Sequence, residues 1–178
     1  MECPFSMRSI LLAGGQSRRF GEPKALILKG NNPLVVDRYR MLQEIDPNPM
    51  ILAGQIAHKI RAHLPEAEII EDSQQGPAAA ISQLPHQGLH LVMAVDMPHL
   101  DGRDLSSFLT FAEGPAILGT EPATLPCILR LPLDLRVGSS LRAQLTAQNA
   151  PHLQPADVST TRLIQFNTKA AWKALIPP

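Results

Sequence analysis

Short apolar or alternating runs recur along the chain and predict buried β-strands. They span residues 9–13, 50–54, 67–72, 89–97, 116–120 and 127–131. The segments between them have apolar residues at helical spacing, over residues 33–45, 55–64, 77–84, 101–112 and 134–148. After about residue 149 this rhythm is lost. There, residues 160–167 predict one more strand and residues 168–175 predict a closing amphipathic helix, with Trp172 as its docking anchor.

Repeated alternation of strand and helix predicts an α/β protein. Right-handed strand–helix–strand crossovers produce a mostly parallel, Rossmann-like sheet with helices on both faces, a three-layer α/β/α arrangement. A length of 178 residues is typical of one domain, so we expect a single domain over residues 1–178. Open sheets of this kind bind ligands at the carboxyl ends of their strands. We therefore expect the functional residues on the loops that follow strands.

The overall charge removes several classes of partner. Sixteen basic and sixteen acidic residues cancel, so no global field favours nucleic acid or a membrane surface, and any polyanion site must be a local cluster.

The two cysteines, Cys3 and Cys127, lack the spacing of a zinc site and fit a reducing compartment. No apolar run approaches the ~20 residues of a membrane helix, and the N-terminus lacks a secretory signal. We expect a cytoplasmic protein.

The loop after the first predicted strand carries the strongest local signal. Gly14 and Gly15 allow a sharp turn and close approach of backbone N–H groups to an anion. Arg18, Arg19 and Lys24 add three cations, a combination that suits a polyphosphate. The spacing matches neither the Walker A pattern nor the dinucleotide fingerprint. The alternative is a flexible turn with solvated basic residues.

Two aspartates follow later predicted strands. Asp96 ends the apolar run 89–97, where Pro98 prevents continuation of the ladder. A lone carboxylate beside a phosphate loop is a candidate Mg²⁺ ligand, because protein-bound Mg²⁺ is typically held by one or two carboxylates together with substrate phosphates. The alternative for Asp96 is a helix cap, a role for which Asp101 and Asp104 are better placed. Asp72 has a similar place after residues 67–72, as a base or ribose contact or as a turn residue without a ligand.

Four segments in this order, "LAGGQSRRFGEPKAL", "EDSQQGPAAAI", "VDMPHL" and "FNTKAAW", resemble the molybdenum cofactor guanylyltransferases of the nucleotidyltransferase superfamily. The resemblance covers most of the chain and implies the fold of the nucleotide-diphospho-sugar transferases. It also implies transfer of GMP from Mg-GTP to the terminal phosphate of molybdopterin, with release of pyrophosphate. The expected protein is a monomer that makes transient contacts with molybdoenzyme maturation proteins.

The resemblance also implies a role for each residue of these motifs. Leu12, Ala13, Gly14 and Gly15 would bind the nucleotide, and Lys24 is the lysine of the same motif. Arg18 and Arg19 would face the phosphates, and Asp72 would contact the guanine nucleotide. Asp96 would bind both nucleotide and Mg²⁺, and Asn167 would lie near the pterin. The implied step is in-line attack by a substrate phosphate oxygen on the α-phosphorus, driven by positioning and charge neutralisation rather than by a protein nucleophile.

Three departures from the family pattern leave alternatives open. Ala53 stands where a polar group is expected to help bind the base, and Ala80 stands where a glycine is expected. "NTKA" replaces the family's NTPE element, so a proline and an acid are lost. The alternatives are a related transferase that uses CTP or UTP and another phosphate acceptor, a non-catalytic nucleotide-binding module, and a scaffold domain without a nucleotide site.

Overall fold

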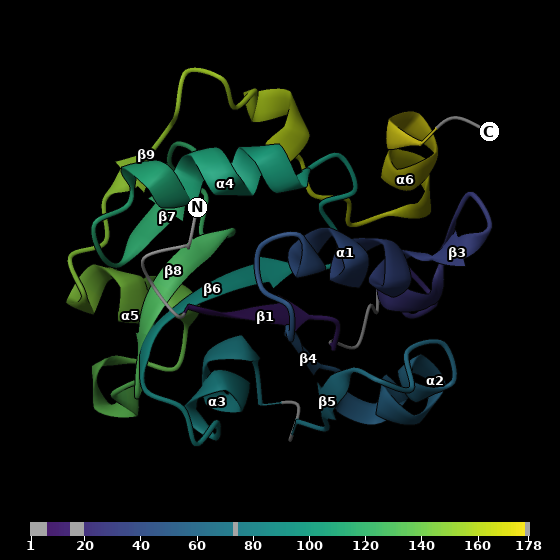
Figure 1. Cartoon of the computed structure of the whole chain (residues 1–178), viewed down its shortest axis with the longest axis horizontal. Helices are drawn as coiled ribbons and strands as arrows, with labels where there is room; N and C mark the ends of the chain where they lie inside the picture. The colour runs from purple at the N-terminus through teal and green to yellow at the C-terminus, as the bar shows by residue number, and fades with distance from the viewer. Residues whose placement is uncertain (1–6, 15–19, 73–74, 177–178) are drawn as a thin grey trace.

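The computed structural model describes residues 7–14, 20–72 and 75–176. Within these residues, seven strands form one sheet in the order β5-β4-β1-β6-β8-β7-β9 (Figure 1). Their bounds are β1 (Arg8–Leu12), β4 (Met50–Leu52), β5 (Glu68–Ile70), β6 (Gly88–Ala94), β7 (Ala116–Leu118), β8 (Cys127–Leu131) and β9 (His152–Leu153). A separate hairpin pairs β2 (Leu28–Lys29) with β3 (Asn32–Pro33).

The sheet is mostly parallel, as the alternation of elements predicts. β1 pairs in parallel with β4 on one side and β6 on the other, and β4 pairs in parallel with β5. β8 runs against both of its neighbours, β6 and β7, whereas β9 is parallel to β7. The carboxyl ends of β5, β4, β1 and β6 therefore lie side by side at one edge of the sheet, where a ligand is expected.

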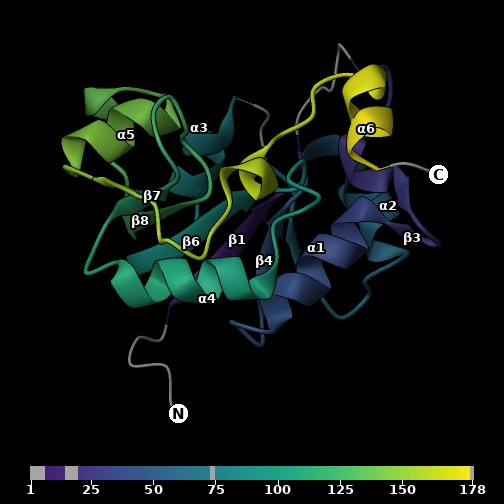
Figure 2. The same ribbon diagram turned by 90° about the horizontal axis from the view of Figure 1, so that it is seen from above.

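Helices cover both faces of the sheet (Figures 1 and 2). The α-helices are α1 (Leu34–Gln43), α2 (Ala57–Arg61), α3 (Pro77–Ser82), α4 (Gly102–Phe111), α5 (Leu141–Ala147) and α6 (Lys169–Leu175), with 3-10 turns η1 (Lys24–Leu26), η2 (Gly54–Ile56), η3 (Leu135–Val137) and η4 (Thr160–Leu163). Side chains of successive strand residues point to opposite faces, so Leu11 packs in the core with α1 and α4 whereas Ile10 packs with α3 and α5. This arrangement is the predicted three-layer α/β/α fold. No helix in the described part of the chain is long and apolar enough to cross a membrane.

The predicted strand over residues 160–167 is wrong. Residues 160–163 form the 3-10 turn η4, whose first N–H groups Ser159 helps to satisfy by accepting a hydrogen bond from Thr161 N. The strand after α5 is instead β9, which fills the sheet edge beside β7. Phe166 is buried although it is not part of a β-ladder. Its backbone N–H donates one hydrogen bond to the carbonyl of Asp96, at 3.2 Å.

Two predicted helices are shorter than their apolar spacing indicates. The pattern over residues 134–148 is divided into η3 and α5, and Gly138 separates them with φ of 144°, a conformation that glycine adopts readily. The pattern over 55–64 is divided into η2 and α2. The small hairpin of β2 and β3 has no counterpart among the predicted elements, because strands of two residues carry no periodic signal.

Candidate active site

Gly14 lies where the carboxyl ends of three strands converge. Its N–H donates to the carbonyl of Leu52 at 2.9 Å, which holds the start of the glycine loop against the end of β4. A Cβ at Gly14 would lie 2.9 Å from Asp72 Oδ2 and 3.2 Å from the backbone N of Gly54. Only a residue without a side chain fits there, so Asp72, at the end of β5, can approach the loop closely.

A second group forms around Lys24, which the turn η1 places opposite the end of β6. The ammonium Nζ of Lys24 lies 2.7 Å from Asp96 Oδ2 and 2.9 Å from Asn167 Oδ1. Only 14% of the Lys24 side chain and 15% of the Asp96 side chain are exposed, so this ion pair is largely shielded from water. The structure thus brings together three predicted site residues that are far apart in the sequence.

The other carboxylate oxygen of Asp96 is buried and has no hydrogen-bond partner among the described residues. A buried polar atom without a partner costs free energy, and such atoms in folded proteins call for an explanation such as an ion. With Lys24 on Oδ2 and nothing in the described part of the chain on Oδ1, the carboxylate offers one oxygen to a cation. This donor fits Mg²⁺, which prefers hard oxygen ligands.

The two groups lie on neighbouring strands. Val95 N donates to the carbonyl of Leu12 at 3.0 Å, so the loop that carries Asp96 begins beside the loop that carries Gly14. Leu12 ends β1 half-buried, and Ala13 is buried directly after it. Gly15, Arg18 and Arg19 lie outside the described residues, and the phosphate contacts predicted for them stay predictions.

Asp101 and Asp104 serve the following helix. Asp101 accepts from the backbone N–H groups of Arg103 and Asp104, and the Asp104 side chain accepts from Asp101 N, which completes a capping box at the start of α4. Arg162 donates to Asp104 at 2.7 Å and so ties η4 to this helix. Asp101 and Asp104, and not Asp96, therefore cap this helix.

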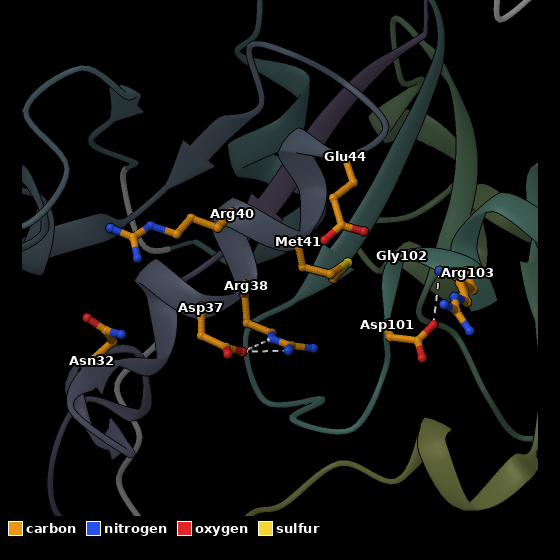
Figure 3. Close-up of a pocket in the computed structure, with 9 residues that line it drawn as sticks. All are labelled: Asn32, Asp37, Arg38, Arg40, Met41, Glu44, Asp101, Gly102 and Arg103. Atoms are coloured by element: carbon orange, nitrogen blue, oxygen red, sulfur yellow. Dashed lines mark hydrogen bonds and ion pairs between the residues drawn. The ribbon is translucent and has the colours of Figure 1, made fainter. Parts of the chain in front are cut away.

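A polar cavity of about 530 Å³ lies between α1 and the start of α4 (Figure 3). Arg38 on α1 is 4% exposed, pairs with Asp37, and donates to the carbonyl of Met97 at 3.0 Å and to that of Leu100. These bonds fasten the residues that follow Asp96. Arg38 therefore ties the loop that follows Asp96 to α1.

Sequence reasoning missed the aromatic residues beneath Lys24. Phe166 lies 5.2 Å below the ammonium, with its ring centroid 5.5 Å from that of Phe20 and 4.7 Å from that of Trp172. Trp172 packs against the core as predicted for a docking anchor. Phe166 directly precedes the predicted site residue Asn167, which could have indicated that it lies near the site. The strand expected over residues 160–167 instead suggested a purely structural role for its side chain. In the described residues no group of three or more His, Cys, Asp and Glu side chains is arranged to hold a metal.

The fold and these two groups define an α/β domain with a cluster of polar residues at the carboxyl ends of its parallel strands, where such domains bind ligands. The model of the MobA-like NTP transferase domain matches residues 9–151, about four fifths of the chain. The chain therefore belongs to this family of nucleotidyltransferase domains, as its motifs indicate.

Individual relatives agree with this assignment. A probable molybdenum cofactor guanylyltransferase of Bacillus cytotoxicus is 30% identical over 105 residues, which are 55% of this chain and 53% of that protein. The chain thus aligns with about half the length of this curated relative. Among solved structures, a nucleotidyl transferase from Methanothermobacter has a TM-score of 0.76 at 15% identity, covering 96% of this chain and 95% of the other. The molybdopterin-guanine dinucleotide biosynthesis protein A of Archaeoglobus fulgidus has 0.65 at 19%, covering 96% and 97%. These structures establish the fold.

Proposed function

We propose that this chain transfers GMP from GTP to the terminal phosphate of molybdopterin and releases pyrophosphate. The observation that carries the proposal is the group of Lys24, Asp96 and Asn167 at the end of β6, beside the glycine loop that follows β1. Family membership supports nucleotidyl transfer in general. The choice of GTP and molybdopterin rests on the sequence motifs and on the name of the Bacillus relative.

The glycine loop and Lys24 are proposed to hold the triphosphate. Gly14 allows the chain to pass close to Asp72, which we assign to the nucleoside end of the donor. Lys24 supplies a positive charge at the opposite end, where the phosphates would lie next to Asp96. Arg18 and Arg19, on the same loop, are assigned to the phosphates by the motif alone.

Asp96 is the residue proposed to hold Mg²⁺. Its Oδ2 is fixed by Lys24, whereas its buried Oδ1 has no partner in the part of the chain that the structure describes. Bound Mg²⁺ would neutralise charge on the phosphates of the donor. Since one carboxylate seldom holds Mg²⁺ alone, the remaining ligands would come from the donor phosphates and water.

The chain's own contribution to the reaction is positioning and charge. Phosphoryl-type transfers need little covalent help from protein, because the attacking and leaving oxygens only have to be in line and the developing charge neutralised. Lys24, held by Asp96 and Asn167, brings an ammonium of fixed position to the phosphates. The proposal therefore requires no nucleophilic side chain.

One observation favours a second candidate function, in which the donor nucleotide carries a base other than guanine. Ala53 is fully buried at the end of β4, and its side chain offers no hydrogen bond where the family pattern has a polar group. A related enzyme that uses CTP or UTP with another phosphate acceptor is the second candidate.

A screen of melting temperature against ATP, GTP, CTP and UTP with Mg²⁺ separates these candidates. The proposal predicts the largest stabilisation with GTP, because a ligand that binds only the folded state raises its apparent stability. The largest shift with CTP or UTP would favour the second candidate. No shift with any of the four would contradict a nucleotide site and favour the scaffold alternative.

A further inference from the structure

The C-terminal segment, residues 164–176, is fastened to the segment that carries Lys24. The rings of Phe20 and Phe166 meet edge to face at 5.5 Å. Lys169 Nζ lies 2.9 Å from Glu22 Oε1 and 5.9 Å from the centroid of the Phe20 ring. With the bond from Lys24 to Asn167, these contacts join residues 20–24 to residues 166–169 at several independent points.

Phe166 is the residue of this segment that lies at the centre of these contacts. Its side chain is fully buried, its N–H donates to the carbonyl of Asp96, and its ring packs against those of Phe20 and Trp172. A fully buried ring in contact with two other rings has little freedom to change rotamer. The ring is therefore a fixed surface attached both to the Asp96 loop and to α6.

The Lys24 ammonium lies over this surface, 5.2 Å from the centroid of the Phe166 ring. The negative face of an aromatic ring attracts a cation, and the attraction is largest where water is excluded. At 14% side-chain exposure, Lys24 is in that situation. Unlike Asp96, the ring attracts the ammonium without a formal negative charge that would repel a phosphate.

We propose that Phe166 is a positioning residue, whose ring, braced by Phe20 and Trp172, holds the Lys24 ammonium beside Asp96 for the phosphates of the nucleotide. The inference rests on the proposed nucleotide site and adds to it a residue to which the family resemblance assigned no role. A cation–π contact depends on the electron density of the ring, whereas core packing depends only on its shape. Lowering the electron density at constant shape therefore weakens the hold on Lys24 and leaves the packing unchanged.

The test is a series of full-length proteins with mono-, di- and trifluorophenylalanine at position 166, together with Phe166→Leu. Successive fluorines lower the electron density of the ring with little change in volume. We expect the Kd for Mg-GTP to rise stepwise with fluorine number and to rise by roughly 3- to 30-fold in Phe166→Leu. Gln165→Ala, at an exposed neighbouring position, is the matched control and should bind normally.

A measurement without nucleotide keeps this inference separate from the proposed function. In the ligand-free protein, the Hε protons of Lys24 should show an upfield NMR shift from the ring current of Phe166. The shift should be lost in Phe166→Leu and kept in Gln165→Ala. An absent ring-current shift, or a Kd that ignores fluorine number, would overturn the positioning role. A native protein that keeps the ring-current shift but binds none of the four nucleoside triphosphates would overturn the proposed function instead, and with it the role of Phe166 toward phosphates.

Discussion

Lys24 and Asp96, 72 positions apart in the chain, form a partly buried ion pair with 2.7 Å between Nζ and Oδ2. The pair joins the glycine loop after β1 to the end of β6. It leaves the other oxygen of Asp96 without a partner in the described structure. This relationship underlies the account of the site, because it places a cation and a free carboxylate oxygen at the same point.

Asp96→Ala should abolish Mg²⁺-dependent pyrophosphate release. We expect a loss of at least ~10²-fold in kcat, the order observed when one preorganised electrostatic group is removed from an active site. Asp157→Asn is a suitable control, because this exposed carboxylate accepts a bond from Ser107 on α4 and is not part of the group formed by Lys24, Asp96 and Asn167. If Asp96→Ala turns over at a rate close to that of the control, Asp96 is not the Mg²⁺ ligand of the reaction.

Lys24→Met should weaken the binding of nucleoside triphosphates, because the substitution keeps the aliphatic stem and removes the charge. Calorimetry with Mg-GTP should show a Kd raised by an order of magnitude or more, since bonds to charged groups contribute about 1.5–3 kcal/mol. Lys59→Met removes a charge from an exposed position on α2 and should leave the Kd unchanged. A Kd equal in both variants would argue against a phosphate role for Lys24.

Much of this site could be predicted from the sequence, because its parts follow strands. Gly14, Asp72 and Asp96 lie at the ends of apolar runs whose carboxyl ends share one edge of a parallel sheet, and Lys24 follows on the segment after the first run. The contact of Asn167 with Lys24 could not be predicted in that way, since it joins residues 143 positions apart and neither lies on a strand. The direction of β8 was equally hidden, because a buried strand has the same side-chain pattern whether it runs parallel or antiparallel.

The error over residues 160–167 has a physical cause that also hid Phe166. Alternating apolar residues indicate that every second side chain is buried, but a strand also needs a neighbour to accept its backbone hydrogen bonds. In this fold β9 occupies the edge beside β7. The later segment therefore buries Phe166 against Phe20 and Trp172 without joining a ladder, and it contributes to the site through side chains.

Gly14→Ala should disrupt the site through steric contact alone. The new methyl group would lie 2.9 Å from Asp72 Oδ2 and 3.3 Å from the carbonyl carbon of Ala53, so the backbone or the carboxylate has to move. We expect a loss of about 1–3 kcal/mol in the free energy of unfolding and weaker nucleotide binding. Gly114→Ala is the matched control, because a Cβ at Gly114 would meet nothing within 4 Å. If urea denaturation gives the same stability for both variants, the close approach of Asp72 to Gly14 is incorrect.

His90 should make the protein less stable in acid. Burial in β6 lowers the pKa of its imidazole below the ordinary value of 6.5, with smaller contributions from the nearby charges of His86 and Arg8. Below about pH 6.5 the unfolded chain therefore binds a proton that the folded chain resists. The stabilisation is complete above that pH and is lost as the pH falls toward the folded pKa, by about 1.4 kcal/mol for each unit of pKa depression.

Urea denaturation at pH 7.5 and pH 5.5 measures this effect. The native protein should lose more free energy of unfolding between the two pH values than His90→Gln, which has no titrating group at this position. An equal loss in both proteins would show that His90 does not carry the acid sensitivity.

Pyrophosphate release from each of the four nucleoside triphosphates, measured in the presence of molybdopterin and Mg²⁺, decides whether this chain is a guanylyltransferase. We expect release from GTP that requires both molybdopterin and Mg²⁺ and that is absent in Asp96→Ala. Binding of a nucleotide with no pyrophosphate released, with molybdopterin or any other phosphate acceptor, would contradict the account and identify a nucleotide-binding module without transferase activity.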